Sequence, residues 1–179
     1  LEIKKQLGNR RGIANSYSNI GIIYTDQGDY PLALEYHFKS LEIKKQIGNK
    51  LGIDISYTNI GDVYLKQGKY KKAEKYYHMS TKIAAEIGDM EGLMVNYEGL
   101  SEALGRGLGE WHKANEYYKL YTTVKDSLFN EQKSRQITEM QTKYETVEKE
   151  KKIELLMKDN NIRELKLNKQ RIIIVSSIS

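Results

Sequence analysis

The chain repeats its own sequence with a period of forty residues. Residues 41–80 align with residues 1–40 without a gap, and 22 of the 40 positions are identical. A third, weaker copy, one residue longer, runs from Thr81 to Tyr121. A fixed period of this length is typical of stacked supersecondary units, each of which buries its apolar face against its neighbours. The sequence therefore predicts an array and not a single globular core.

Each copy has the pattern of two helices joined by a short turn. In the first copy, apolar and small residues recur at offsets of three and four over residues 17–24 and again over residues 33–41, and each group marks one helix face. Gly28, like Gly68 in the second copy, lies between the two groups and is expected to end the first helix at positive φ. Pro31 falls in the first turn of the second helix, where its missing N–H costs little. Each copy therefore predicts a helical hairpin.

Glycines inside the first helices predict close helix packing. Gly21 and Gly61 occupy equivalent interior positions, where Gly is less favourable than Ala by about 1 kcal/mol. We expect close approach of the second helix to compensate. The small residues Ala33 and Ala73 are the predicted contacts.

The first residues match the end of a repeat. Residues 1–9 correspond to residues 41–49, so we expect them to be the C-terminal end of a preceding repeat. The Gly-Asn pairs at residues 8–9 and 48–49 are then expected to end one hairpin and to start the next.

The composition favours helices and excludes several kinds of site. One proline in 179 residues, with abundant Glu, Lys, Leu, Ile and Ala, indicates almost unbroken helix, so the predicted fold class is all-α. The absence of cysteine excludes disulfides and thiolate metal sites. The net charge of +5 is spread through the chain with acids interleaved among the bases, which indicates solvated helix faces and not a nucleic-acid footprint.

No catalytic, cofactor or metal site is predicted. The glycine-rich run at residues 105–109 has the spacing of a phosphate loop, but no strand precedes it, so we interpret it as a turn. His37 and His78 occupy nearby places in successive second helices. Two histidines without a nearby carboxylate or third ligand make a poor metal site, so packing or surface roles are favoured. No Ser-His-Asp arrangement, pair of acids in an apolar setting or His-Glu-x-x-His motif is apparent, and the chain is predicted to be non-catalytic.

The spaced residues of the hairpins resemble the tetratricopeptide repeat. That pattern has a large or aromatic residue, then Leu or Ile beside Gly, then Tyr, followed in the second helix by Ala, an aromatic and a small residue. The two clearest copies supply it as Tyr17, Ile20, Gly21, Tyr24, Ala33, His37 and Ser40, and as Tyr57, Ile60, Gly61, Tyr64, Ala73, Tyr77 and Ser80. The third copy departs from it, with Ser101 in place of Gly and Tyr121 in place of the small residue. The resemblance implies a tetratricopeptide-type helical-hairpin solenoid, with helices longer than in the usual period of about 34 residues.

The resemblance also implies where a partner would bind. Stacked hairpins form a concave groove lined mainly by the first helices, and such grooves bind peptides or partner helices. The groove-facing positions that it implies are Asn15, Ser18, Asn19, Ile22, Asp26, Ile55, Thr58, Asn59, Asp62 and Lys66. Some family members clamp a terminal carboxylate with Lys, Asn and Arg in the groove, and of those positions only Asn59 matches. For Asn19 and Asn59 a hydrogen bond within the repeat that supports packing remains the alternative.

The tail after the repeats has a coiled-coil pattern. Residues 125–170 contain neither Gly nor Pro and are densely charged. The apolar residues that alternate by three and four, with a stutter between the two groups, are Ile137, Met140, Tyr144 and Val147, then Leu155, Ile162, Leu165 and Ile172. This spacing predicts a long helix that forms a parallel homodimer, with a lone helix packed back on the array as the alternative.

The last nine residues, RIIIVSSIS, are apolar on every side of a helix. A membrane span needs about 20 apolar residues, so we predict that residues 171–179 are the start of a truncated span, with a dimer contact or the end of the coiled coil as alternatives. The predicted organisation is therefore a repeat array over residues 1–124, a coiled-coil linker over residues 125–170 and the start of a span.

The order of these parts resembles bacterial tetratricopeptide sensor proteins, especially those common in Bacteroidetes. In that family the repeats precede a coiled coil, one membrane helix and a cytoplasmic output domain, such as a histidine kinase or a helix-turn-helix regulator. The stretch KDSLFNEQKSRQITEMQTKYETVEKEKKIELL is most similar to the family's linker. The resemblance implies a single-pass, membrane-anchored protein whose repeats bind a protein or peptide, require no cofactor and pass binding through a dimeric helix to an output domain, with a histidine kinase favoured.

Two points stay open at the level of sequence. The family places its repeats in the periplasm, whereas Lys166, Lys169 and Arg171 beside the apolar run would by themselves favour the cytoplasm. The alternative functions are a constitutive scaffold for complex assembly and the regulatory arm of a transcription factor.

Overall fold

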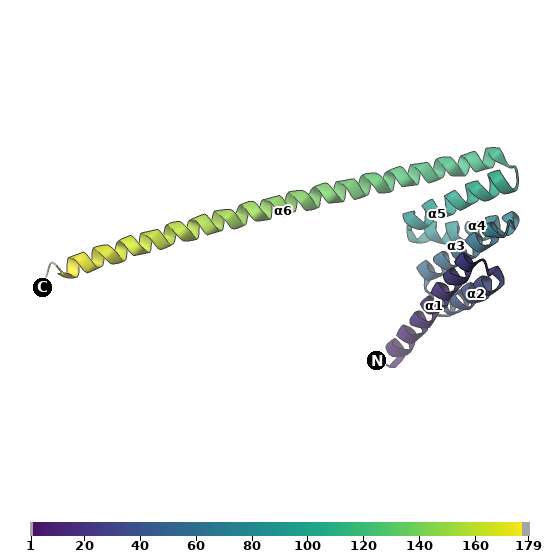
Figure 1. Ribbon diagram of the computed structural model, residues 1–179, viewed down its shortest axis with the longest axis horizontal. Coiled ribbons are helices and arrows are strands. Elements are labelled where there is room, and N and C mark those ends of the chain that lie inside the picture. Colours follow the sequence, from purple (N-terminus) through teal and green to yellow (C-terminus); the bar gives the residue numbers. More distant parts are fainter. Residues whose placement is uncertain (1, 177–179) are drawn as a thin grey trace. The chain divides into compact units, whose positions relative to one another are not determined.

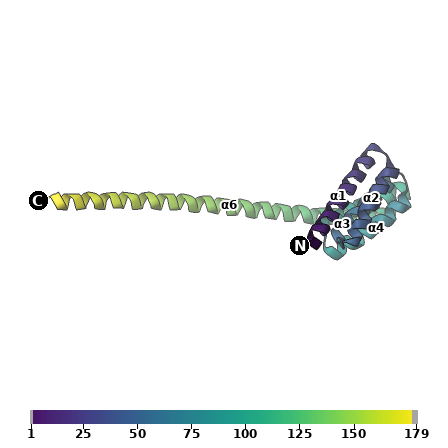
Figure 2. The same cartoon turned by 90° about the horizontal axis from the view of Figure 1, so that it is seen from below.

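The chain folds into helices joined by short turns (Figure 1, Figure 2). The computed structural model describes the backbone of residues 2–176 and the side chains of residues 9–170. Its elements are α1 (Glu2–Gln27), α2 (Tyr30–Gln46), α3 (Lys50–Lys66), α4 (Tyr70–Ile87), α5 (Met90–Glu102), the π-helical turn η1 (Ala103–Gly107) and α6 (Trp111–Ser176). The all-α prediction is confirmed. Helix α1 packs with α2 and α3 packs with α4, as the predicted hairpins require.

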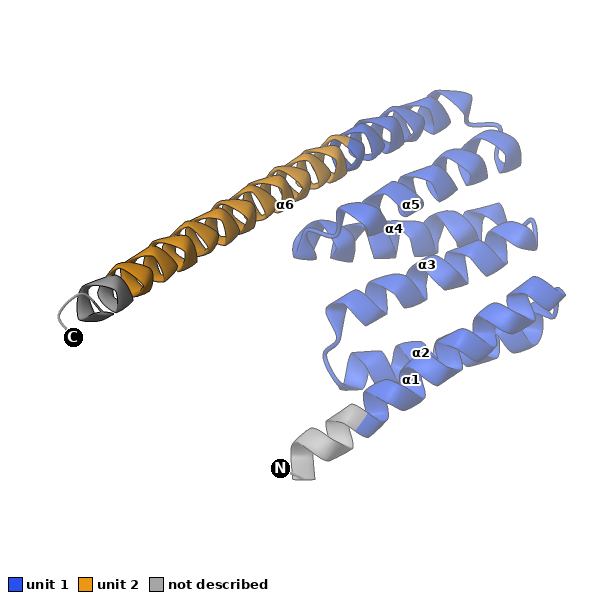
Figure 3. Cartoon of the chain, turned by 60° about the vertical axis from the view of Figure 1, so that its left-hand side comes forward, with its two compact units in different colours: residues 1–129 blue, residues 130–179 orange. Residues whose placement is uncertain are grey.

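The chain divides into two compact units, residues 1–129 and residues 130–179 (Figure 3). Helix α6 contributes to both. Its first turns complete the array, where Val124 is buried and Leu128 is half-buried, whereas every side chain from Phe129 to Gln170 is exposed. The array therefore extends a few residues beyond the boundary predicted at residue 124, because α6 keeps its apolar contacts for one more turn.

Glycines end the helices at regular intervals. Gly28 and Gly68 have the predicted positive φ, at +80° and +70°, and so do Gly48, Gly88 and Gly109. Gly28, Gly48, Gly68 and Gly88 follow one another at intervals of twenty residues. Only glycine adopts this left-handed conformation without strain, so each one stops a helix and reverses the chain.

The predicted helix end at residues 8–9 is wrong. Helix α1 runs without a break through Gly8 and Asn9, whereas Gly48 and Asn49 end α2 and start α3. The two pairs have the same sequence, so the Gly-Asn pair alone does not decide where a helix ends. After Gly48 the chain folds back, and α3 packs against α2.

The interior glycines are closely packed, but not against the predicted alanines. A Cβ on Gly21 would lie 2.6 Å from Cε1 of His37, and a Cβ on Gly61 would lie 2.8 Å from Cε1 of Tyr77. The nearest side chains thus come from residues one turn further along the second helix than Ala33 and Ala73, which are also buried. The ring of Tyr77 also contacts Gly99 of the next hairpin, so it packs between two first helices.

The extra residue of the third copy lies in η1. Leu108 donates its backbone N–H to the carbonyl of Ala103, five residues earlier, at 3.1 Å. A π-helical turn holds one residue more than an α-helical turn, so it lengthens the connection from α5 to α6 without changing which residues pack. The glycine-rich run is a turn, as predicted, and Gly107 leaves room for the ring of Tyr70.

The first helices lie on the inner side of the array. Helix α1 contacts α3, and α3 contacts α5. In the described part of the chain, the backbones of α2 and α4 do not pack closely against each other. An array whose first helices are closer together than its second helices curves toward the first helices. Its concave side is therefore formed by α1, α3 and α5.

No helix in the described residues contains an apolar stretch long enough to cross a membrane. The predicted start of a span at residues 171–179 lies outside the residues whose side chains are described.

Candidate binding groove

Three pockets follow one another along the first helices, and together we call them the groove. The pocket between α1 and α3 has a volume of about 310 Å³, the one between α3 and α5 about 700 Å³, and the one between α5 and the start of α6 about 410 Å³. Asn59 lines both of the first two pockets. The first two pockets therefore adjoin each other at Asn59.

The α1–α3 pocket brings together half of the predicted groove residues. The predicted residues that line it are Ile22, Asp26, Asn59, Asp62 and Lys66. Nζ of Lys66 lies 3.7 Å from Oδ1 of Asp26, in an exposed ion pair between the two hairpins. Nδ2 of Asn59 donates to Oγ of Ser18 at 3.3 Å. The packing bond that was the alternative for Asn59 thus joins two hairpins and does not lie within one repeat.

Asp62 is held by the hydroxyl of Tyr77, which donates to its Oδ1 at 2.7 Å. Burial raises the pKa of Asp62, and the bond from Tyr77 and the charge of Lys66 oppose that rise. Burial and the charge of Asp62 raise the pKa of Tyr77 in turn. This pair fixes one carboxylate at the floor of the pocket.

His37 lines the same pocket from the second helix of the first hairpin. It is only 1% exposed, and its Nδ1 has no hydrogen-bond partner in the described structure. Burial, together with the positive charge of Lys44, lowers the pKa of His37 to about 4. The ring is therefore neutral at physiological pH and acts in packing. His78 is exposed near Glu74, as the sequence interpretation of a surface role proposed.

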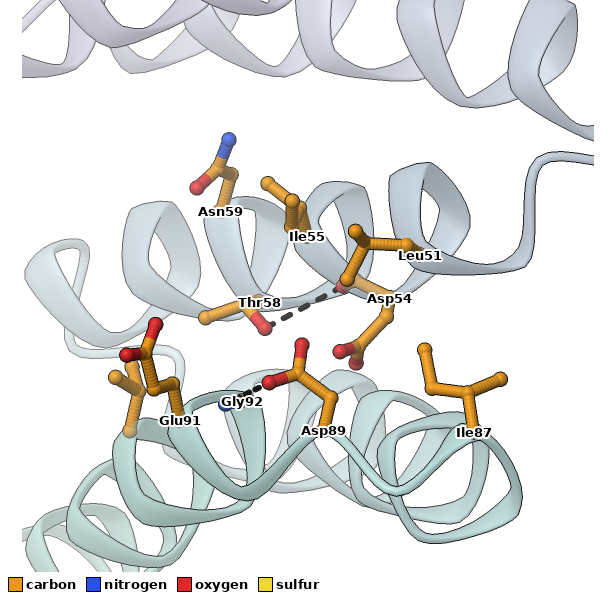
Figure 4. A pocket seen from close by; sticks show the side chains of 10 residues that line it. Leu51, Asp54, Ile55, Thr58, Asn59, Ile87, Asp89, Glu91 and Gly92 are labelled. Carbon is orange, nitrogen blue, oxygen red and sulfur yellow. Dashed lines mark hydrogen bonds between the residues drawn. The ribbon is translucent and has the colours of Figure 1, made fainter. Parts of the chain in front are cut away.

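The α3–α5 pocket has apolar walls and acidic groups (Figure 4). Its walls are the side chains of Leu51, Ile55, Ile87 and Val95, and its acids are Asp54, Asp89 and Glu91. No basic side chain lines it. It is thus an apolar pocket that contains three acidic side chains and no basic one.

Two carboxyl groups face each other in this pocket, from α3 and from the N-terminus of α5 (Figure 4). A Cβ on Gly92 would lie 2.7 Å from Oδ2 of Asp54 and 2.9 Å from Oδ2 of Asp89, so both oxygens converge on this glycine. Asp89 also caps α5 by accepting the backbone N–H of Gly92 at 2.9 Å. The sequence analysis found no pair of acids in an apolar setting, and the structure corrects it, because the pair comes from two different hairpins.

Asp54 is the buried member of this pair, at 1% exposure. Ser80 donates a hydrogen bond to its Oδ1. Burial raises the pKa of Asp54, hydrogen bonds from Ser80 and Asn96 oppose the rise, and the charge of Asp89 adds to it. No cation in the described structure compensates this carboxylate.

Thr58 belongs to a network that joins three helices. Its Oγ1 lies 2.8 Å from Oγ of Ser80 and donates to Oδ1 of Asn96 at 2.9 Å, and Nδ2 of Asn96 lies 2.9 Å from Oγ of Ser80. Asn96 and Ser80 are fully buried, while Thr58 is half-buried and lines the pocket. The network fixes the positions of α3, α4 and α5 around Asp54.

The remaining predicted residues are dispersed. Ile55 is 45% exposed and lines the α3–α5 pocket. Ser18 is buried beneath Asn59. Asn15 and Asn19 are exposed on α1 but lie outside the three pockets.

Sequence reasoning missed most of the α3–α5 pocket. The residues it missed there are Leu51, Asp54, Ile87, Asp89, Glu91, Gly92 and Val95. One signal was available, because Asp54 aligns with the buried Ala14 of the first copy and so puts a charge at an interior position. The third copy offered another, since Glu102 aligns with Asp62 and lines the α5–α6 pocket with Glu98, Arg106, Trp111 and Tyr118.

Among the described residues, no group of three or more His, Cys, Asp or Glu side chains lies close enough together to hold a metal ion. The groove offers carboxylates, hydroxyls and apolar walls, which suit the binding of a polar segment with apolar side chains.

Stacked antiparallel hairpins with an inner groove define a class of solenoid proteins that act as protein-interaction or scaffold modules. The chain belongs to the tetratricopeptide repeat family, whose sequence profile matches residues 12–86 and residues 52–126. A similar fold occurs in the crystal structure of the TPR domain of Arabidopsis FLU, with a TM-score of 0.62, 19% sequence identity, and coverage of 66% of this chain and 98% of that one. A comparison with curated proteins found no significant match.

Proposed function

We propose that this chain is the non-catalytic sensory region of a membrane-anchored signalling protein, and that it binds a segment of a protein partner in the groove. Helix α6 carries the proposal. Its first turns pack in the array, where Ala114 and Val124 are buried, and the same helix continues to Ser176. A ligand that moves α5 therefore acts directly on α6, and helix shifts of this kind are a known means of signalling.

The exposed apolar stripe of α6 supports pairing of two copies. Ile137, Met140, Tyr144 and Val147 are between 41% and 72% exposed although they follow one helix face at offsets of three and four. Unpartnered stripes of this spacing pair as coiled coils. The stripe continues at Leu155, which is 66% exposed, after a polar step at Lys151. We therefore assign α6 to a parallel homodimer.

The groove supports the binding of a partner. Ile55 and Val95 occupy equivalent places in successive first helices, and both are more than 40% exposed within the α3–α5 pocket. Aliphatic side chains at equivalent concave positions are suited to an extended or helical segment that crosses several repeats.

The proposal of a membrane anchor and an output domain rests on the resemblance to bacterial tetratricopeptide sensor proteins. A histidine kinase is the output that we favour. The coding sequence that follows Ser179 distinguishes the possibilities, because a completed apolar span and a kinase domain would support the proposal. A span with no output domain would leave a scaffold, and a helix-turn-helix domain would make the chain the arm of a transcription factor.

Sedimentation velocity of the 179-residue chain tests the dimer. We expect a dimer for the unmodified chain and a monomer for the variant Met140→Lys/Val147→Lys, which places two charges in the stripe. The variant Gln141→Lys/Thr146→Lys adds the same charge off the stripe and should stay dimeric. If the unmodified chain is a monomer at concentrations well above those in a cell, coupling through a paired helix is wrong.

A further inference from the structure

We propose that the groove binds a basic segment, with a lysine or arginine side chain of the partner placed against the Asp54–Asp89 carboxyl pair. This inference rests on the proposed function, and it specifies the chemistry of the partner segment that binds in the groove. It follows from the distribution of charge along the groove, the geometry of the Asp54–Asp89 pair and the walls around that pair.

The groove is negative although the chain is positive. The three pockets are lined by seven acidic and only two basic residues, whereas the whole chain has a net charge of +5. Both basic residues are already paired, Lys66 with Asp26 and Arg106 with Glu102. The remaining carboxylates leave an excess negative charge along the groove. Such a surface attracts and orients a basic partner and disfavours an acidic one.

The pair of acids at the α3–α5 pocket gives this charge a specific site. Asp54 is nearly inaccessible and has no basic partner, and a neighbouring carboxyl group lies across Gly92. Burial of a charge without a partner is unfavourable, and proximity of two like charges adds to that energy. A cation placed beside the pair would reduce both effects. In the first copy the equivalent of Asp54 is Ala14, so the stacking of the hairpins does not require an acid at this position.

The walls of the pocket suit a long basic side chain. Leu51 and Ile55 are 46% and 45% exposed, and with Ile87 and Val95 they provide apolar surface in the same pocket as the acids. Lysine and arginine bury their methylene stems along apolar surface while the charged end keeps polar contacts. A volume of about 700 Å³ is ample for one such side chain and its flanking residues.

A bound metal ion fits the site less well. Ca²⁺ usually takes about six to eight oxygen ligands, and Mg²⁺ requires near-ideal octahedral geometry. In the described structure the pair is not joined by a third acid or histidine in a metal-binding group. Apolar walls also contribute nothing to a metal ion but stabilise an organic cation.

The test is a selection of displayed random twelve-residue peptides on the 179-residue chain, followed by fluorescence anisotropy of the best peptide in several NaCl concentrations with a chelator present. We expect enrichment of peptides with Lys or Arg beside apolar residues, and affinity that falls as NaCl rises. Replacement of the key lysine by norleucine keeps the stem and removes the charge, so it should weaken binding by about tenfold or more.

Variants of the protein give the matched comparison. Asp54→Asn/Asp89→Asn keeps the shapes and the helix cap and should also lose about tenfold in affinity. Asp29→Asn is the control, because Asp29 caps α2 outside the pockets as Asp89 caps α5. It should bind as the unmodified chain does. Should the double variant fail to fold, judged by circular dichroism, the norleucine peptide and the single variant Asp89→Asn still decide the question.

The other outcomes separate this inference from the proposed function. Ile55→Arg places the protein's own guanidinium in the pocket and serves as the blocked groove. Enriched peptides that are neutral or acidic, and that fail to bind Ile55→Arg, would overturn the basic partner but keep the groove function. Basic peptides that bind the double asparagine variant equally well would overturn the role of the Asp54–Asp89 pair. No peptide enriched over the blocked groove would overturn both proposals.

Discussion

At the scale of single residues, glycine and the ring opposite it determine how closely each hairpin packs. Gly61 has the ring of Tyr77 within 2.8 Å of the position that a Cβ would take, so no other residue fits there without displacing the ring or the helix. Gly12, in α1, has no atom within 4 Å of the same position. The two glycines are both helical, and they differ only in what surrounds them.

This contrast gives a prediction for two Gly→Ala variants. Gly61→Ala should destabilise the protein by about 1–3 kcal/mol, because the added methyl group overpacks the contact with Tyr77. Gly12→Ala should leave stability unchanged or raise it by up to about 1 kcal/mol, because Ala has the higher helix propensity. Thermal unfolding followed by far-UV circular dichroism measures both. Equal losses in the two variants would mean that helix geometry, and not the contact with Tyr77, requires glycine at position 61.

Single residues also show which features of the structure could be predicted from the sequence and which could not. The glycines in the turns were predictable, because positive φ is a local property that Gly28 and Gly68 fulfil. The nearest neighbour of Gly61 was not predictable, because Ala73 and Tyr77 lie one turn apart on the same face of α4 and the spacing does not distinguish between them. The facing of Asp54 and Asp89 depends on how successive hairpins are rotated, which no residue type specifies on its own.

At the scale of elements, the helices differ in whether a side chain caps the backbone N–H groups of their first turn. Asp29, Asn49 and Asp89 cap α2, α3 and α5, accepting a backbone N–H at 3.2, 3.1 and 2.9 Å. Helix α4 starts after Lys69, whose side chain makes no capping hydrogen bond. A lysine there also places a positive charge at the positive end of the helix dipole.

We therefore expect Lys69→Asn to stabilise the protein by about 1 kcal/mol, since Asn can accept the N–H that Lys69 leaves without a side-chain partner. Lys69→Ala removes the same charge but cannot cap, so it isolates the electrostatic part of the gain. The measurement is the midpoint of chemical unfolding for the three proteins. If Lys69→Ala raises the unfolding midpoint as much as Lys69→Asn does, removal of the charge accounts for the whole gain in stability.

The elements also show where tertiary structure overrides local sequence. The Gly-Asn pair ends a helix at residues 48–49 and not at residues 8–9, although the flanking sequences are nearly the same. The extra residue of the third copy was visible in the alignment, but its accommodation as the π-helical turn η1 was not. Neither result can be read from the local sequence alone.

At the scale of the whole molecule, the array is built from equivalent modules. Equivalent hydrogen bonds recur in successive hairpins, since Oγ of Ser40 donates to the carbonyl of Ala14 at 2.7 Å and Oγ of Ser80 donates to the carbonyl of Asp54 at 3.1 Å. Stability in such arrays is approximately a sum of hairpin and neighbour terms. For the stability of the array, the alternation of first and second helices therefore matters more than the number of helices.

This predicts opposite results for two deletions. Removal of residues 41–80 joins equivalent points of α2 and α4 and keeps the alternation of helices, so the shortened chain should remain helical and unfold cooperatively, at a lower temperature. Removal of residues 49–68 deletes only α3 and joins α2 to α4, two second helices, whose apolar faces then lack first-helix partners. We expect aggregation or loss of cooperative unfolding in circular dichroism and light scattering. A well-folded product from the second deletion would contradict the modular account.

The spacing of the turn glycines has a consequence for the history of the gene. Gly28, Gly48, Gly68 and Gly88 recur every twenty residues, so two consecutive helices with their turns occupy the same length of coding sequence over this stretch. Recombination between neighbouring copies can then add or remove one hairpin in frame, and each new junction repeats a turn that already exists. The gap-free alignment of residues 1–40 with residues 41–80, with 22 of 40 positions identical, is what duplication of one hairpin followed by point mutation would leave. Groove length can thereby change in a single genetic step, while the specificity of each pocket evolves separately by point mutation.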